Sequence, residues 1–249
     1  MDKFIQHLAS ANQACRCGDP SLLMSEDGSL TVEWAPFDHI EKEAKLVIVG
    51  LTPGRQQADN ALKSCFEHLQ LGASISTSLK AAKKFASFSG PMRTNLIAML
   101  DKIGLSNPFG VETCADFFKD KSSSVHFTSA VRYPVFKSGL NYSGSPRPLG
   151  NSMLRSLIET KLGEEVLAIP GAVWVPLGHH AESVLQHFVD CGSLSSKVVF
   201  SGLPHPSGAN MERIAYFLGK KPRNMLSPKT NPDKIDFARQ SLLDKVALI

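Results

Sequence analysis

Residues 45–60, KLVIVGLTPGRQQADN, decide the fold of this chain. Residues 46–49 are apolar and largely β-branched, and a short run of this kind predicts a strand buried on both faces of a sheet. The strand ends at Gly50, and Pro53 with Gly54 turns the chain, because proline lacks an N–H and glycine permits close backbone approaches. Open α/β sheets bind ligands where their strands end. The segment therefore predicts a ligand site, although an ordinary strand–loop connection fits it equally well.

A second apolar segment ends in an equally distinctive loop. Residues 198–203, VVFSGL, predict another strand, and the sequence PHPSGAN follows at 204–210. His205 is held between two prolines, and Ser207 or Asn210 has a side chain suited to cap the helix that follows. A strand ending in GLTPG with a distant HPSGxxxxR resembles the uracil-DNA glycosylase superfamily, whose first motif is G-x-[D/N/A]-P-[Y/G/A] and whose last contains H-P-S. The resemblance covers residues 47–219; each motif alone is weak, and their order and separation are more specific.

Composition sets wide bounds on the class of protein. The chain has 249 residues, 43% of them hydrophobic, which suffices for one well-cored domain. The net charge is only +4, from 27 Lys+Arg against 23 Asp+Glu, so a local nucleic-acid face is permitted without being required. No apolar run is long enough to span a membrane and no signal peptide is evident, so a cytoplasmic protein without membrane contact is expected.

The cysteines predict no cofactor. Five scattered cysteines suit a reducing compartment. Some relatives in the superfamily hold an iron–sulfur cluster on four cysteines, but here Cys15 and Cys17 are spaced C-x-C rather than C-x-x-C, and no later pair completes a set. Free thiols are therefore expected, with no metal.

The order of elements predicts the architecture. Strands and helices follow one another as β-α-α-β-α-β-α-β-α, which indicates a three-layer α/β/α sandwich with a mainly parallel, four-stranded central sheet, as the resemblance also implies. We expect a single domain over residues 1–249: an N-terminal segment 1–44 in which Trp34 packs against the sheet, a core 45–219 and a C-terminal helix in 220–249. Further strands are expected at 125–132 and 172–177, and helices at 1–14, 58–71, 78–88, 92–103, 151–167, 181–189, 211–219 and 233–246.

The resemblance implies a catalytic role for His205. A base glycosylase flips a nucleotide out of DNA, stacks the base in a pocket and hydrolyses its N-glycosidic bond. His205 is expected near the base carbonyl as a neutral hydrogen-bond donor, and removing such a donor typically costs about a hundred- to a thousandfold in rate. The alternative is a histidine that only caps the next helix. The loop placed under the sugar, which we name the GLTPG loop, comprises Gly50, Leu51, Thr52, Pro53 and Gly54.

Thr52 departs from the family pattern. Relatives carry Asp or Asn at this position to polarise or position the attacking water, and a threonine hydroxyl is no useful general base near neutral pH. A threonine can still hydrogen-bond a water, and some relatives with a non-acidic residue there are active, so Thr52 is kept as a catalytic candidate. Asp59 is the nearest carboxylate that could serve instead, and a solvated helix residue is the alternative for it.

Three further positions define the expected base pocket. Phe88 is the first choice for the aromatic residue that stacks on the base and Phe85 the second, with core packing as the alternative for both. Thr128, or Ser129 if the register shifts by one, replaces an asparagine that reads the pyrimidine edge in many relatives. Gly54 replaces a tyrosine that excludes C5 substituents in uracil-specific members. The resemblance therefore implies a roomier pocket that admits a C5-substituted pyrimidine, with uracil as the alternative.

The expected DNA contacts surround this pocket. Ala209 stands where relatives insert an apolar wedge into the duplex and is too short to fill the gap, so Met211 or Asn210 substitutes for it, or the substrate is single-stranded. The candidate DNA-binding residues, several of them sequence-independent phosphate contacts, are Ser207, Asn210, Met211, Arg213, His179, Lys83, Lys84, Arg93, Lys137 and Arg147.

Together these patterns predict a monomeric, monofunctional DNA glycosylase that leaves an abasic site. Its substrate is expected to be a modified pyrimidine, such as those of viral DNA. The alternatives are a uracil-DNA glycosylase in base-excision repair and a non-catalytic DNA-binding relative, for which Thr52 and Ala209 are the best evidence. A nucleotide-binding α/β protein is disfavoured, because neither G-x-G-x-x-G nor G-x-x-x-x-G-K-[ST] occurs at the first turn.

Overall fold

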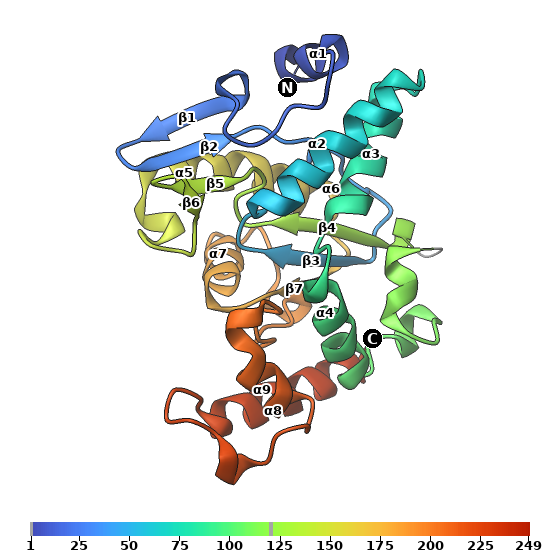
Figure 1. Cartoon of the computed structure of the whole chain (residues 1–249). Coiled ribbons are helices and arrows are strands. Elements are labelled where there is room, and N and C mark those ends of the chain that lie inside the picture. The colour runs from blue at the N-terminus through green and yellow to red at the C-terminus, as the bar shows by residue number, and fades with distance from the viewer. Residues whose placement is uncertain (1, 120–121) are drawn as a thin grey trace.

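The computed structural model describes residues 2–119 and 122–249. Its central sheet has three parallel strands in the order β4-β3-β7, with β3 (Leu46–Gly50) between β4 (Val125–Ser129) and β7 (Val173–Pro176) (Figure 1). All five residues of β3 are buried, as the apolar run predicts. The mixed α/β class is thereby confirmed.

The prediction of four regular strands is wrong in one respect. Residues 199–203 run parallel to β7 through two isolated bridges, Trp174 to Val199 and Leu177 to Leu203, and form no continuous strand. In β7, the N–H groups of Val173 and Leu177 donate to the β3 side, so the alternate position, Pro176, faces residues 199–203 and has no N–H to donate. The fourth segment is therefore attached to the sheet at its ends only.

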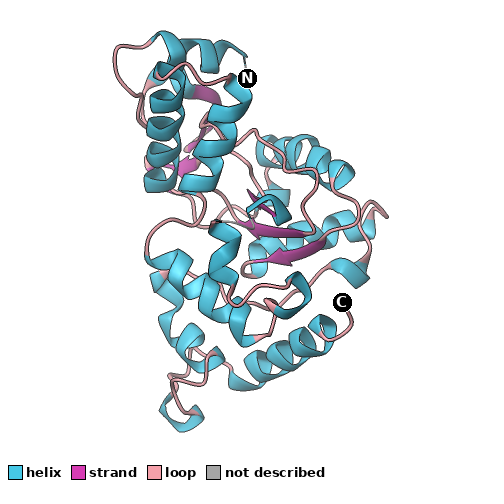
Figure 2. Cartoon of the chain, turned by 90° about the vertical axis from the view of Figure 1, so that its right-hand side faces the viewer, coloured by secondary structure: helices cyan, strands magenta, loops and turns pink. Residues whose placement is uncertain are grey.

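Helices cover both faces of this sheet (Figure 2). Val47 and Val49 of β3 enter one hydrophobic cluster, and Leu46 and Ile48 enter the other. Because successive side chains of a strand point to opposite faces, two separate cores require three layers. Residues of α1 (Asp2–Ser10), α2 (Arg55–Gln70), α3 (Ile75–Ala86), α5 (Ser152–Leu157), α6 (Gly163–Ala168) and α7 (His179–Asp190) join the first core, and those of α4 (Pro91–Lys102), α8 (Met211–Phe217) and α9 (Pro232–Val246) join the second.

Helix boundaries differ from expectation at several places: α1 ends at Ser10 instead of residue 14, and α2 begins at Arg55 instead of residue 58. The helix expected at 151–167 contains a π-helical turn, Ile158–Leu162, between α5 and α6. The helix expected at 78–88 begins earlier and ends at Ala86, because Phe88 adopts a left-handed φ of 51° that no α-helix continues.

A second sheet was not predicted. Strands β1 (Leu23–Asp27), β2 (Leu30–Glu33), β5 (Val135–Lys137) and β6 (Leu140–Asn141) form an antiparallel sheet in the order β1-β2-β5-β6. It joins the N-terminal segment to the segment after β4, both of which read as turn-rich sequence. Trp34, which follows β2, is fully buried and stacks on Phe4, so its predicted packing role is confirmed.

Within residues 2–119 and 122–249, no helix combines the length and the apolar character that a membrane crossing needs.

Candidate functional site

A cleft of about 1140 Å³ opens at the carboxyl ends of the strands. Gly50 at the end of β3, Ser129 at the end of β4, Gly178 after β7 and His205 after the fourth segment all line it. Parallel strands bring their carboxyl ends to one edge of a sheet, so segments far apart in sequence meet there. The cleft therefore lies where the ligand site was predicted, and the whole GLTPG loop, residues 50–54, lines it.

His205 is held in one tautomer. The backbone N–H of Ser207 donates to His205 Nδ1 at 3.3 Å, so Nδ1 carries a lone pair and the neutral ring carries its proton on Nε2. Burial lowers the pKa of His205, which favours this neutral form. Gly178, with φ of 80°, backs the ring, since a Cβ at this position would lie 3.1 Å from His205 Cβ. Within the described residues, Nε2 has no hydrogen-bond partner, and it is free to donate to a ligand.

Phe88 lies in the cleft wall and Phe85 does not. The Phe88 side chain is 6% exposed and meets Phe127 edge-on at a centroid distance of 5.9 Å. Its ring also packs over Gly50, where an added Cβ would lie 3.4 Å from Phe88 Cε1. Phe85 is 58% exposed outside the cleft lining. The first choice of aromatic residue therefore has the position that was predicted, and its stacking on a base stays a prediction.

Thr128 and Ser129 are the two hydroxyl-bearing residues at the end of β4. Both line the cleft and both are buried. Thr128 Oγ1 has no hydrogen-bond partner in the described part of the protein. Buried polar atoms are nearly always paired, so an unpaired hydroxyl in a cleft wall marks a position that a ligand can satisfy.

The Thr52 side chain is hydrogen-bonded within the protein. Its hydroxyl donates to Tyr133 O at 2.8 Å and accepts from the Val135 N–H at 3.1 Å. The hydroxyl hydrogen is therefore used within the protein, and one lone pair is taken as well. The side chain thus fixes the GLTPG loop to the start of β5, and because one lone pair remains on this cleft-lining residue, the role of Thr52 in holding a water stays a prediction.

The prediction that Asp59 serves as the catalytic carboxylate is corrected. Its Oδ1 accepts the backbone N–H of Cys17 at 2.8 Å, and the residue lies outside the cleft lining. The carboxylate ties α2 to the N-terminal segment, which sequence spacing alone does not indicate. In the described ranges, Glu182 in the first turn of α7 is the only carboxylate among the cleft-lining residues; no motif pointed to it.

Asn141 is a cleft residue that sequence reasoning missed. Its Oδ1 accepts the Arg55 N–H at 2.9 Å and so caps the first turn of α2 from another element. Its Nδ2 lies 3.4 Å from the place of a Cβ on Gly54, whose φ of −79° is open to any residue. The space that glycine leaves is thus bordered by the Asn141 amide. Ser138-Gly139 between two strand-like runs was the available signal, since that dipeptide suits a two-residue hairpin.

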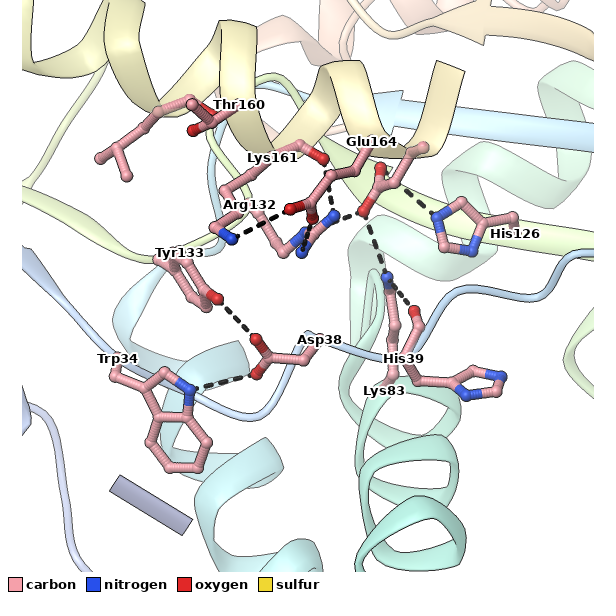
Figure 3. A network of polar contacts seen from close by, with 12 residues as sticks. Trp34, Asp38, His39, Lys83, His126, Arg132, Tyr133, Thr160, Lys161 and Glu164 are labelled. Atoms are coloured by element: carbon pink, nitrogen blue, oxygen red, sulfur yellow. Dashed lines mark hydrogen bonds and ion pairs between the residues drawn. The ribbon is translucent and has the colours of Figure 1, made fainter. Parts of the chain in front are cut away.

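Lys83 belongs to a buried charge cluster and not to the protein surface (Figure 3). Its Nζ donates to His39 O at 2.7 Å and lies 3.8 Å from Glu165 Oε1. Arg132 Nε donates to the same Glu165 oxygen at 2.9 Å, and His126 Nε2 lies 3.4 Å from its Oε2. The prediction that Lys83 grips a DNA phosphate is therefore wrong, because the side chain is 5% exposed and already paired.

The cluster shifts the acidity of its members. Burial lowers the pKa of Lys83 to about 8 and that of His126 to about 4, since a low-dielectric interior disfavours the charged forms. Burial opposes ionisation of Glu165 as well, but the neighbouring charges of Lys83, His126 and Arg132 outweigh it and lower the Glu165 pKa. One carboxylate thus pairs with two basic side chains, Lys83 and Arg132, in the cleft wall.

The remaining basic candidates for phosphate contacts differ in whether their side chains are free to reach DNA. Arg93 Nη2 donates to Phe85 O and Ser87 O, and its guanidinium lies over the Phe118 ring, so it braces the turn that carries Phe88 rather than reaching for phosphate. Three other candidates are exposed: Lys84, which donates to Lys119 O, Lys137, which donates to Ser145 O, and Arg147.

The loop after the fourth segment is braced by its own side chains. Asn210 Nδ2 donates to Ser207 Oγ, and Arg213 Nη1 donates to Asn210 Oδ1 at 2.7 Å. Neither Ser207 nor Asn210 makes the side-chain cap that was considered for the following helix. All three residues line the cleft, as does exposed His179, while Met211 is 49% exposed beside it.

One group of side chains elsewhere has metal-ligand chemistry. His7, Cys15 and Asp19 bring one ligand atom each to within 4.8 Å of one another. Asp19 Oδ1 already accepts from the N–H and the hydroxyl of Ser21. All five cysteines are unbonded to one another, as predicted, and the expectation of no cofactor stays a prediction.

The fold and the cleft define an α/β protein whose candidate site lies where parallel strands end. The chain is 34% identical over 223 residues to the Bacillus subtilis (strain 168) protein described as "Uncharacterized protein YoxB". The aligned region covers 88% of this chain and 87% of that protein. The chain therefore belongs to the YoxB family. No protein-family model and no solved structure matches it.

Proposed function

We propose that this protein is a monofunctional DNA glycosylase of the uracil-DNA glycosylase type. The observation that carries the proposal is His205: a neutral imidazole with a free Nε2–H, held at the strand end opposite the GLTPG loop. A donor of this kind stabilises negative charge that develops only as a bond breaks.

The reaction requires little more than positioning and one well-placed donor. The flipped base stacks on Phe88, and the unpaired Thr128 hydroxyl bonds its edge. As the N-glycosidic bond breaks, its electron pair goes to the base, and His205 Nε2–H stabilises the charge on the base carbonyl oxygen. Water adds to the sugar carbon and loses a proton to solvent, which leaves an abasic site and a free base.

The proposed substrate is a pyrimidine with a substituent at C5. Gly54 provides no side chain to exclude such a group, and the Asn141 amide borders the space at 3.4 Å from the Gly54 Cβ position. Asn141 Nδ2 offers a hydrogen-bond donor there, so a substituent with an oxygen fits better than a hydrocarbon one. Uracil, which fits the same pocket with space left over, is the competing substrate.

The test is base release from labelled DNA. Oligonucleotides carrying uracil, thymine or an oxygen-bearing C5-substituted cytosine are incubated with the protein, abasic sites are cleaved by alkali, and the released base is identified by mass spectrometry. Release of a C5-substituted base by the native protein, and not by His205→Ala, supports the proposal. Absence of release from every substrate contradicts it.

A non-catalytic DNA-binding relative is the second candidate. It is favoured by Thr52, whose hydroxyl hydrogen is committed to Tyr133 O, and by Asp59, which faces Cys17 instead of the cleft. Specific binding of modified DNA without base release distinguishes this candidate from the enzyme.

A further inference from the structure

The cleft continues past His205 along a second stretch that the family motifs do not cover. There its lining comes from α9, from α7 and from residues of the fourth segment; in Figure 1, α9 lies below the sheet and α7 lies higher, beside the strands. Lys234, Phe237, Ala238 and Ser241 of α9 all line this part of the cleft. Their spacing of three and four residues places them in one stripe along the helix. We call this part of the cleft the α9 groove.

The α9 groove begins with three cations that have no acidic partner in the described part of the chain. Arg213, Lys229 and Lys234 are exposed and line the cleft. Arg213 donates to Asn210 Oδ1 and to Lys229 O, both neutral acceptors. The positive end of the α9 dipole, at Pro232, lies beside them and adds to the field.

The acidic residues of the neighbouring surface are engaged elsewhere. Asp233 pairs with Arg223 at 2.5 Å, and Asp236 pairs with Arg239 at 2.7 Å. Glu182 stands on the α7 side of the cleft. The mouth of the groove therefore keeps a surplus of positive charge, which suits a chain of phosphates.

Phe237 is the aromatic member of the groove. It is 78% exposed, although the opposite face of α9 supplies Ile235 and Leu242 to the core. A single exposed apolar residue needs no explanation. An exposed aromatic ring one helical turn after a lysine, in a basic groove continuous with a candidate base pocket, matches the stacking platforms of proteins that bind single-stranded nucleic acid.

We infer that the α9 groove binds the single-stranded DNA that flanks the extruded nucleotide, with Arg213, Lys229 and Lys234 on phosphates and Phe237 stacked on a neighbouring base. The inference rests on the proposed glycosylase function and adds the strand state of the substrate to it. Ala209 agrees with it, because this exposed residue is too short to fill the gap that a flipped base leaves in a duplex. A single strand leaves no such gap.

Fluorescence anisotropy with a labelled single-stranded oligonucleotide tests the groove. Phe237→Ala weakens binding about thirtyfold, the middle of the range for one lost base stack, and Phe237→Trp retains it. Lys229→Ala with Lys234→Ala lowers the slope of log affinity against log salt by about 1.4, since each single-strand phosphate contact contributes about 0.7. The same oligonucleotide in a duplex binds more weakly to the native protein.

Matched controls lie at the opposite end of the sheet. Lys42→Ala with Lys45→Ala makes the same charge change near the amino end of β3, and Leu71→Ala removes an exposed apolar side chain at the far end of α2. Both leave affinity and slope unchanged.

The results separate this inference from the proposed function. The inference about the groove is overturned if the groove variants keep the affinity and salt slope of the native protein. It is also overturned if the native protein binds the duplex more tightly than the single strand, or does not bind single-stranded DNA. These outcomes count against the groove whether or not bases are released. Groove-dependent binding without base release supports the groove and contradicts the glycosylase.

Discussion

At the scale of single residues, Lys83 has the side chain of a phosphate contact and the surroundings of a core ion pair. Removing it leaves Glu165 with one cation fewer in a buried site. Lys83→Ala is expected to lower the free energy of unfolding by about 3–5 kcal/mol, the usual cost of breaking a buried pair. Urea unfolding measures this. Lys84→Ala, one residue along and exposed, changes it by no more than about 0.5 kcal/mol; equal effects of the two substitutions would contradict the buried pairing.

His126 makes the stability of the folded protein depend on pH. Its pKa in the folded protein is about 4, against 6.5 when unfolded, so between these values the unfolded chain binds more protons. Stability therefore rises with pH across this window and is lost as the pH falls from 6.5 towards 4, with a slope of up to about 1.4 kcal/mol per pH unit from this one group. The NMR titration of the imidazole protons tests it directly. A His126 midpoint near 6.5 would contradict the account.

A substitution at Thr128 distinguishes a role in binding a ligand from a role in stabilising the fold. The Thr128 hydroxyl lacks a partner in the described protein, so Thr128→Val removes no hydrogen bond and keeps the shape. We expect an unchanged or slightly higher free energy of unfolding, together with a roughly two- to tenfold loss of substrate affinity, the value of one hydrogen bond. A loss of stability above about 1 kcal/mol with native affinity would show that the hydroxyl serves the fold alone.

Which residues lie in the cleft was easier to predict from the sequence than which side chains they contact. His205, Phe88 and Thr128 lie in the cleft because they follow strand ends or a turn that the apolar pattern already marks. The burial of Lys83 depends on Glu165, some eighty positions later in the chain, and no local pattern reports such a pairing. Sequence alone therefore predicted a surface lysine.

At the scale of elements, the β5–β6 hairpin delivers Asn141 to the first turn of α2. Gly54→Ala should be tolerated, because Gly54 has an ordinary φ of −79° and the new Cβ would meet only the Asn141 amide at 3.4 Å. Gly54→Tyr must displace that amide, and overpacking of this kind costs about 1–3 kcal/mol. The same clash should exclude C5-substituted bases far more than uracil.

A double-mutant cycle isolates the contact between the two elements. Asn141→Gly alone removes the cap on the Arg55 N–H and costs about 0.5–2 kcal/mol. In the Gly54→Tyr background it also makes room for the ring, so the combined cost is smaller than the sum. Strictly additive unfolding free energies would show that Asn141 does not close the space beside Gly54.

The elements that carry this contact are the ones that sequence reasoning missed. Strands β5 and β6 have three and two residues, too few for an alternating pattern to be visible. Strands β3 and β7 were predicted because burial on both faces leaves a continuous apolar run in the sequence, and β4 was predicted from the alternation in VHFTSAVR at 125–132.

At the scale of the whole molecule, a parallel sheet with both faces covered brings the ends of three strands and of the fourth segment to one cleft. That arrangement follows from element order and could be predicted. The irregular fourth segment could not, because it results from the missing N–H of Pro176 and from the φ of 110° at Gly202.

The central claim is that His205 stabilises the leaving base, and single-turnover base release tests it most directly. With the protein in excess over DNA, His205→Ala should lower the rate of release by at least about a hundredfold and leave DNA affinity nearly unchanged. The rate of base release by His205→Asn, whose amide keeps a hydrogen-bond donor, should fall between the rates of the native protein and of His205→Ala. A near-native rate in His205→Ala would contradict the account, as would a loss that arises wholly from weaker binding.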